Sequence, residues 1–154
     1  MPELTGHMLH FAYGEDLSRV GFLETCPGAD WFGPARLDGH RLIFDAAGRV
    51  SVRACEGSVV WGALWMVPAA LLPVLDARAG ENFERTTRRI VSPAGPRTEA
   101  TLYVTEVAEA AEVAPSKERL HALLDAAKGN HLPADYLAVL KGLGGRVKVR
   151  KDSR

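Results

Sequence analysis

The fold is decided near the start of the chain by residues 11–17, Phe11-Ala12-Tyr13-Gly14-Glu15-Asp16-Leu17. The apolar run His7–Tyr13 predicts a first β-strand, and Gly14 marks its end. Glycine at a strand end lets the backbone turn sharply and approach a ligand closely, and the amides after it can point at an anion. Taken alone, the pattern also fits a plain tight turn, so its meaning depends on the rest of the chain.

The composition is that of one ordinary globular domain. The chain has 154 residues, of which 47% are hydrophobic and 25% are charged, and 19 Lys and Arg balance 19 Asp and Glu. That length and apolar content suit a single domain with a substantial core. A neutral chain has no overall attraction for nucleic acid or an anionic membrane, so we expect neither as a partner.

Two features predict a cytoplasmic location. Cys26 and Cys55 are too few for a disulfide framework and lack metal-ligand spacing, which is typical of a reducing compartment. The N-terminus has no basic segment followed by an apolar one, as a secretory signal would.

Residues 57–75 are uncharged and long enough to cross a bilayer, but their glycine and proline residues and their β-branched content favour a strand followed by a helix.

Hydrophobic periodicity and turn residues predict the order of the elements. After the first strand we expect a helical turn over 17–23 and strands over 35–44 (broken at Gly39), 50–54 and 59–66. A helix over 69–78, ended by Gly80, should follow, and then two strands over 86–92 and 97–107 joined by a turn at 93–96. The last elements are helices over 117–128 and 134–143, the second of them closed by Gly144 and Gly145. Early strands and late helices favour an α+β or closed mixed barrel over a doubly wound parallel sheet. We place one domain over residues 1–145 and a basic C-terminal tail over 146–154.

Most motifs with established chemistry are absent from the sequence. The chain has no GxxxxGKS/T or GxGxxG phosphate loop, no GxSxG elbow and no HExxH metal motif. His7 and His10 lie close together but have no third ligand beside them. We therefore expect no metal and no cofactor.

Several short motifs nevertheless occur together in a fixed order. They are the loop 11–17, Ala35-Arg36-Leu37, Val60-Trp61-Gly62-Ala63-Leu64-Trp65, Leu75-Asp76-Ala77-Arg78-Ala79-Gly80, Pro115-Ser116 and His131-Leu132-Pro133-Ala134-Asp135-Tyr136. Their order and spacing resemble the γ-glutamylcyclotransferase-like family with its AIG2-like plant members, in which the loop reads F-x-Y-G-S-N-L and the helix ends in L-D-x-x-E-G. The resemblance implies an α+β fold, a γ-glutamylcyclotransferase-like mixed β-barrel with flanking helices.

The resemblance also implies a reaction, in which the α-amine of a γ-glutamyl compound attacks its own γ-carbonyl and yields 5-oxoproline and a freed amine. One carboxylate can take the proton from the attacking amine and return it to the leaving amine. Because both reacting groups belong to one molecule, the protein mainly folds and holds it, and the loop amides suit a carboxylate or developing oxyanion. The substrate-binding residues implied are Tyr13, Gly14, Glu15, Asp16, Leu17 and Arg88.

The chain departs from the family where the resemblance implies the general base. The Glu of the E-G pair corresponds to Ala79, whose methyl group cannot accept a proton. In the first loop, Glu15 and Asp16 replace Ser and Asn, and their charges would repel an anionic substrate. We therefore expect cyclotransferase activity to be altered or lost.

Three interpretations follow from these departures. In the first, the protein is a non-catalytic binding or interaction module. In the second, catalysis has moved to another carboxylate, with Glu81 and Glu15 as the candidates and Asp16 beside them. In the third, the acidic loop binds a small amine-bearing ligand. The sequence does not indicate the oligomeric state.

The resemblance also places the pocket and one cation near it. The pocket should lie at the end of the first strand, beside Ala79. We expect Arg88, rather than Arg89, to face this pocket and to pair with Glu15 or Asp16, since successive strand residues point to opposite faces.

Overall fold

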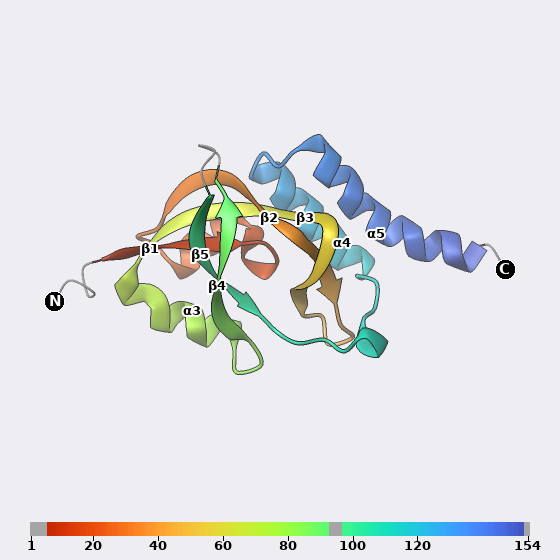
Figure 1. The fold of residues 1–154 in the computed structure, drawn as a ribbon, viewed down its shortest axis with the longest axis horizontal. Helices are drawn as coiled ribbons and strands as arrows, with labels where there is room; N and C mark the ends of the chain where they lie inside the picture. The colour runs from red at the N-terminus through yellow and green to blue at the C-terminus, as the bar shows by residue number, and fades with distance from the viewer. Residues whose placement is uncertain (1–5, 93–96, 153–154) are drawn as a thin grey trace.

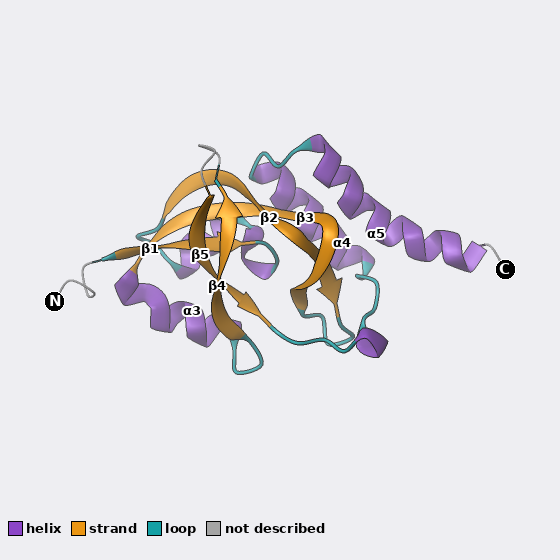
Figure 2. Cartoon of the chain, in the orientation of Figure 1, coloured by secondary structure: helices purple, strands orange, loops and turns teal. Residues whose placement is uncertain are grey.

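The strands of the computed structural model, which describes residues 6–92 and 97–152, form a closed barrel (Figures 1 and 2). They are β1 (His7–Ala12), β2 (Asp30–Phe44), β3 (Val50–Pro68), β4 (Glu84–Val91) and β5 (Arg97–Val104). Their order around the barrel is β1-β3-β2-β4-β5. Neighbours are antiparallel except at the seam, where β1 and β5 are parallel. The expected α+β mixed barrel is confirmed.

Helices flank this barrel on two sides (Figure 1). They are η1 (Glu15–Leu17), α2 (Arg19–Thr25), η2 (Ala69–Leu71), α3 (Leu72–Ala79), η3 (Glu109–Ala111), α4 (Lys117–Gly129) and α5 (Ala134–Asp152). In Figure 1, α3 lies on one side, while α4 and α5 pack together on the other. Ser116 caps the start of α4, where its Oγ accepts from the amide of Arg119. As predicted, Gly80 ends α3; it has φ 90° and follows the last residue of the helix. Glycine adopts such a positive φ without strain.

The two strands expected over 50–54 and 59–66 are one continuous strand, β3. Its pairing with β2 shifts register between Asp38 and His40, across Gly39. Gly39 and Gly57 both have positive φ, 74° and 86°, so these glycines shape a bulge instead of ending a strand. The local sequence cannot reveal this, because the partner strand supplies the hydrogen bonds that keep β3 intact.

The C-terminal helix also differs from the prediction. The prediction that Gly144 and Gly145 close the last helix is wrong, since α5 continues to Asp152. A glycine inside a helix costs only about 1 kcal/mol, which does not by itself end one. The predicted boundary at residue 145 falls inside α5, and the predicted turn at 93–96 lies outside the described residues.

The uncharged stretch 57–75 supplies the second half of β3, then η2 and the start of α3. Among the helices of the described residues, none has the length and apolar character needed to span a membrane.

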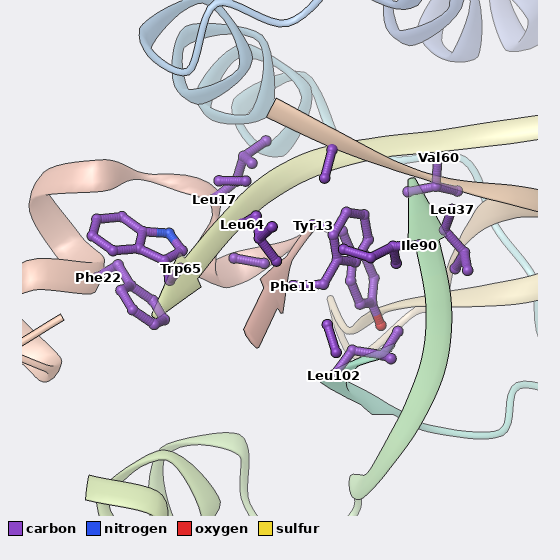
Figure 3. Packing of buried hydrophobic residues seen from close by; sticks show 14 of the residues in the cluster. Phe11, Tyr13, Leu17, Phe22, Leu37, Val60, Leu64, Trp65, Ile90 and Leu102 are labelled. Carbon is purple, nitrogen blue, oxygen red and sulfur yellow. The ribbon is translucent and has the colours of Figure 1, made fainter. Parts of the chain in front are cut away.

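The apolar core fills the barrel interior and continues beneath α2 (Figure 3). Trp65 stacks on Phe22, with ring centroids 4.5 Å apart. Gly62 of the Val60–Trp65 motif allows β1 to approach β3, because a Cβ there would collide with the carbonyl oxygen of Ala12 and lie 2.9 Å from Phe11 Cζ. This close contact fixes the end of β1, from which the loop 13–17 departs.

Candidate functional site

A small pocket lies where β1 ends. Its volume is about 80 Å³, and its walls are formed by Phe11, Tyr13, Gly14, Asp16, Val50, Leu75, Arg78, Ala79, Phe83 and Tyr103. β1 and the loop after it supply one part of the wall, and the end of α3 supplies another. The structure therefore brings Tyr13, Gly14 and Asp16 together with Ala79, residues more than sixty positions apart in the chain.

The loop is held in place by its own backbone and by α4. The amide of Leu17 donates to the carbonyl oxygen of Gly14 over 3.0 Å and so closes η1. The buried Asn130 donates from Nδ2 to the carbonyl oxygen of Leu17 over 2.6 Å. Gly14 packs closely on Val50, since a Cβ there would lie 3.2 Å from Val50 Cβ, tighter than an ordinary contact. The loop is thus a fixed wall of the pocket.

Asp16 is hydrogen-bonded to a histidine that is almost completely buried. Asp16 Oδ2 lies 3.3 Å from His10 Nε2, and the His10 side chain is 1% exposed. On its other side, His10 Nδ1 lies 3.4 Å from Thr101 Oγ1, which donates its proton to the carbonyl oxygen of Leu9. The His10 imidazole therefore lies between the Thr101 hydroxyl and the Asp16 carboxyl group. A carboxyl group in such a pair can accept and return a proton.

Two tyrosines contribute neutral phenols to the pocket wall. Tyr13 donates to the carbonyl oxygen of Tyr103 over 2.6 Å, and Tyr103 donates to Asp76 Oδ1 over 2.6 Å. Burial raises the pKa of the Tyr13 hydroxyl, and the Asp16 carboxylate raises it further. Burial likewise raises the pKa of Tyr103, with Asp76 as a second cause. Both phenols therefore keep their protons at neutral pH.

Arg78 is a pocket residue that the sequence analysis missed. Its guanidinium donates to Thr25 Oγ1, and it lies 3.5 Å from the carbonyl oxygen of Gly21, so it ties α3 to α2. The helical spacing could have revealed it, because Leu75, Arg78 and Ala79 lie at i, i+3 and i+4 on one face of α3, and all three line the pocket. His10 was also missed as a partner of Asp16, because nothing in a strand pattern shows what a buried side chain contacts.

Other predicted site residues lie elsewhere. Glu81 is exposed after α3 and lines a separate hollow with Asp76 and Arg85, not the pocket. Leu17 is 1% exposed and packs in the core. The backbone of Glu15 belongs to η1, but its side chain lies outside the described part of the structure.

Arg88 was expected to pair with Glu15 or Asp16; the pairing with Asp16 is wrong, and the side chain of Glu15 lies outside the described part of the structure. Arg88 does lie on the same face of β4 as the buried Ile90, and its charge reaches Tyr13, where it counteracts the rise in pKa. Its guanidinium, however, donates to Thr86 Oγ1 and to the carbonyl oxygen of Thr87, each over 2.9 Å. Asp16 has His10 as its partner instead.

No three His, Cys, Asp or Glu side chains gather as metal ligands within residues 6–92 and 97–152. Among the described residues, the groups that line the pocket and can take part in chemistry are one carboxyl group, one guanidinium and two phenols.

A closed mixed barrel with a pocket at a tyrosine–glycine loop defines the γ-glutamylcyclotransferase-like class of proteins. The sequence pattern of the AIG2-like family matches residues 59–140, more than half of the chain, and the chain belongs to this family. The resemblance noted from the motifs is thereby confirmed. A comparison with curated protein sequences finds no match.

Solved structures agree with this assignment. A γ-glutamyl cyclotransferase superposes with a TM-score of 0.80 at 25% sequence identity, over 88% of this chain and 86% of that chain. The uncharacterized protein loc79017 from Homo sapiens gives a TM-score of 0.79 at 25% identity with the same coverage. YkqA from Bacillus subtilis, at 20% identity, shares the fold with a TM-score of 0.72 over 88% of this chain and 53% of its own.

Proposed function

We propose that this γ-glutamylcyclotransferase-like protein binds a small amine-bearing compound of the γ-glutamyl type, and that its cyclisation activity is lost at residue 79. The observation that carries the proposal is the make-up of one pocket: Asp16, Arg78 and Ala79 all line it. The similarity to a γ-glutamyl cyclotransferase supports the class of ligand.

As a location we propose the cytoplasm, because Cys26 and Cys55 are both free.

The charges of the pocket favour a ligand with both an amine and a carboxylate. Asp16, whose side chain is 22% exposed, can bind an ammonium group, and a partly buried ion pair of this kind is screened less than a surface pair. Arg78 provides a planar guanidinium that suits a carboxylate. A γ-glutamyl compound carries both groups on one carbon atom, so it can satisfy both side chains.

The same pocket explains the expected loss of turnover. Cyclisation requires a group that takes a proton from the attacking amine. The position at which the family carries its carboxylate is occupied by the Ala79 methyl group, which can only pack against the ligand. An ammonium held by Asp16 is stabilised in its protonated form, and a protonated amine cannot attack the γ-carbonyl.

Calorimetry with γ-glutamyl amides, combined with a 5-oxoproline assay, tests the proposal. We expect the parent protein to bind without forming product, and Asp16→Asn to weaken binding about tenfold or more, the loss of one charge-assisted contact. Asp30→Asn, at an exposed position at the start of β2, is the matched control and should bind as the parent does. Failure of the parent to bind any γ-glutamyl amide would contradict the proposal.

A second candidate function is cyclisation with Asp16 as the proton acceptor. The hydrogen bond between Asp16 and the buried His10 favours it, because the imidazole can hold the carboxyl group in one orientation. In that case the parent protein forms 5-oxoproline, Asp16→Asn abolishes product formation, and Glu81→Gln leaves it unchanged because Glu81 lies outside the pocket.

A further inference from the structure

His10 lies directly behind the pocket, although it does not line it. Its Nε2 atom lies 3.3 Å from Asp16 Oδ2, and its side chain is 1% exposed. Asp16, by contrast, belongs to the pocket wall and is 22% exposed. A ligand in the pocket therefore meets the Asp16 carboxyl group, and His10 acts on that ligand through Asp16.

The His10 ring is held in place from several sides. Phe22 of α2 stacks on it, with ring centroids 5.4 Å apart and planes 17° from parallel, and the Tyr103 ring of β5 lies 5.8 Å away. In the sheet, the backbone of His10 pairs with Trp65 of β3 and with Thr101 of β5. A carboxyl group bonded to such a fixed ring is restricted to few orientations. The bond uses Oδ2 of the carboxyl group, so Oδ1 can accept from a ligand ammonium.

Of these neighbours of His10, only Asp16 carries a charge at neutral pH. The phenol of Tyr103 keeps its proton, because burial raises its pKa. Around Asp16, burial raises the pKa of the Cys26 thiol, the Asp16 carboxylate raises it further and Arg78 opposes them, so this thiol stays neutral at pH 7. The Arg78 guanidinium is always charged. Imidazole is the side chain that ordinarily changes its charge between pH 5 and 8, so a change of charge in this range falls on the pair of His10 and Asp16.

Uptake of a proton removes the net charge of this pair. The pair has one negative charge while the imidazole is neutral and no net charge once a proton is added, whichever of the two side chains holds it. A ligand ammonium then meets a weaker negative potential, and burial of the imidazole means that solvent screens the change only weakly. Binding of an ammonium group and protonation of the pair therefore oppose each other, and this opposition is reciprocal.

We propose that His10 is a positioning residue of the pocket, which orients the Asp16 carboxyl group toward the ligand and weakens the binding of an ammonium group in acid. This inference rests on the proposed function, because it takes Asp16 to bind the amine of the ligand. It adds a regulation of that site by pH. Asp16 stands where the family loop carries Asn, so the pair belongs to this chain's own loop.

Calorimetry with γ-glutamyl methylamide at pH 7.0 and pH 5.5 tests this inference, since the ammonium and carboxylate of the ligand keep their charges in this range. We expect the parent protein to bind about fivefold more weakly at pH 5.5, the loss that follows when most of the pairs hold the extra proton. Near pH 6, binding should release a proton. Calorimetry in two buffers of different ionisation enthalpy measures that release on the parent protein alone.

Two variants separate the orienting role from the charge. His10→Gln keeps an N–H group for Asp16 but takes up no proton in this range, so it should bind as the parent does at pH 7.0 and lose nothing at pH 5.5. His10→Phe keeps a ring against Phe22 but loses the bond to Asp16, and it should bind about fivefold more weakly at pH 7.0. His121→Gln is the matched control, since it removes the histidine of an exposed pair on α4, 3.6 Å from Asp125. It should keep the pH dependence of the parent protein.

The inference is overturned if the parent protein binds equally well at both pH values, if His10→Gln keeps the parent's loss at pH 5.5, or if His10→Phe binds as the parent does at pH 7.0. In each case the proposed function stands. If His10→Gln does not fold, the proton release of the parent decides, and its absence overturns the inference. If the parent binds γ-glutamyl methylamide at neither pH, the proposed function fails and the inference falls with it.

Discussion

Ala79 lies half-buried in the pocket wall, close to the loop that carries Asp16. Ala79→Glu would supply the carboxylate that the family places there, so we expect 5-oxoproline to form from a γ-glutamyl amide at about a hundredfold above the background seen with the parent protein, a typical contribution of general base catalysis. Ala77→Glu is the control, since Ala77 is exposed on α3 and does not line the pocket. A variant that binds the amide but gains no turnover would show that other groups of the site are also missing.

Gly62 determines how closely β1 approaches β3. A methyl group at this position meets the carbonyl oxygen of Ala12 and the ring of Phe11, and neither can move without shifting β1. We expect Gly62→Ala to lower the free energy of unfolding by about 1–3 kcal/mol, the usual cost of overpacking. Urea denaturation measures this value.

Gly142→Ala provides the matched control for Gly62→Ala, since Gly142 is a helical glycine with open space around its Cα. That change should be neutral or slightly stabilising. Equal stability of the two variants would show that the approach of β1 to β3 tolerates a side chain.

At the scale of elements, a cluster of charges joins the β2–β3 hairpin to the segment after β5. Arg41 donates to both carboxylate oxygens of Glu112, over 2.6 and 3.0 Å, and Arg53 donates to one of them over 2.7 Å. Arg41 is the main cause that lowers the pKa of Glu112 below its ordinary value of 4.5. The folded state therefore binds fewer protons than the unfolded state, so this contribution to stability is present above about pH 4.5 and is lost as the pH falls through the lower, folded-state pKa.

Glu112→Gln should accordingly reduce stability more at pH 7 than at acidic pH. We expect a loss of about 1–2 kcal/mol at pH 7, because the carboxylate is a quarter exposed and its bonds are partly screened. Urea denaturation at pH 7 and pH 3 measures the difference. Glu99→Gln, on the exposed face of β5, should change neither value. A loss that is the same at both pH values would mean that the ion pairs do not cause it.

The motifs predicted the pocket better than they predicted its contacts. The loop after β1 and the end of α3 were placed correctly because both belong to motifs whose spacing reflects one fold. Arg78 and His10 were missed, and the pairing of Arg88 with Asp16 was wrong, because such contacts depend on how strands and helices pack across the barrel. Likewise, β3 was divided at Gly57 because a bulge in a long strand resembles a turn until its partner strand is known.

At the scale of the whole molecule, the barrel is closed by a short parallel contact between β1 and β5. The two strands pair at His10 and Thr101, and the Thr101 hydroxyl donates to the carbonyl oxygen of Leu9 over 3.3 Å. The same hydroxyl lies within hydrogen-bond distance of His10 Nδ1, and His10 Nε2 is in turn within hydrogen-bond distance of Asp16. One side chain thus links the closure of the barrel to the orientation of the pocket carboxyl group.

Thr101→Val keeps the shape of this side chain but removes its hydroxyl, so the seam and His10 each lose a hydrogen bond. We expect the free energy of unfolding to fall by about 1–2 kcal/mol, with faster hydrogen exchange at the amides of β1 and β5 and weaker binding of γ-glutamyl amides. Thr87→Val is the control, since Thr87 lies opposite Thr101 on β4 and is exposed. If Thr101→Val lost stability but bound ligand as the parent does, the barrel seam would be independent of the pocket. If hydrogen exchange at the amides of β1 and β5 were unchanged, Thr101 would not contribute to closing the barrel.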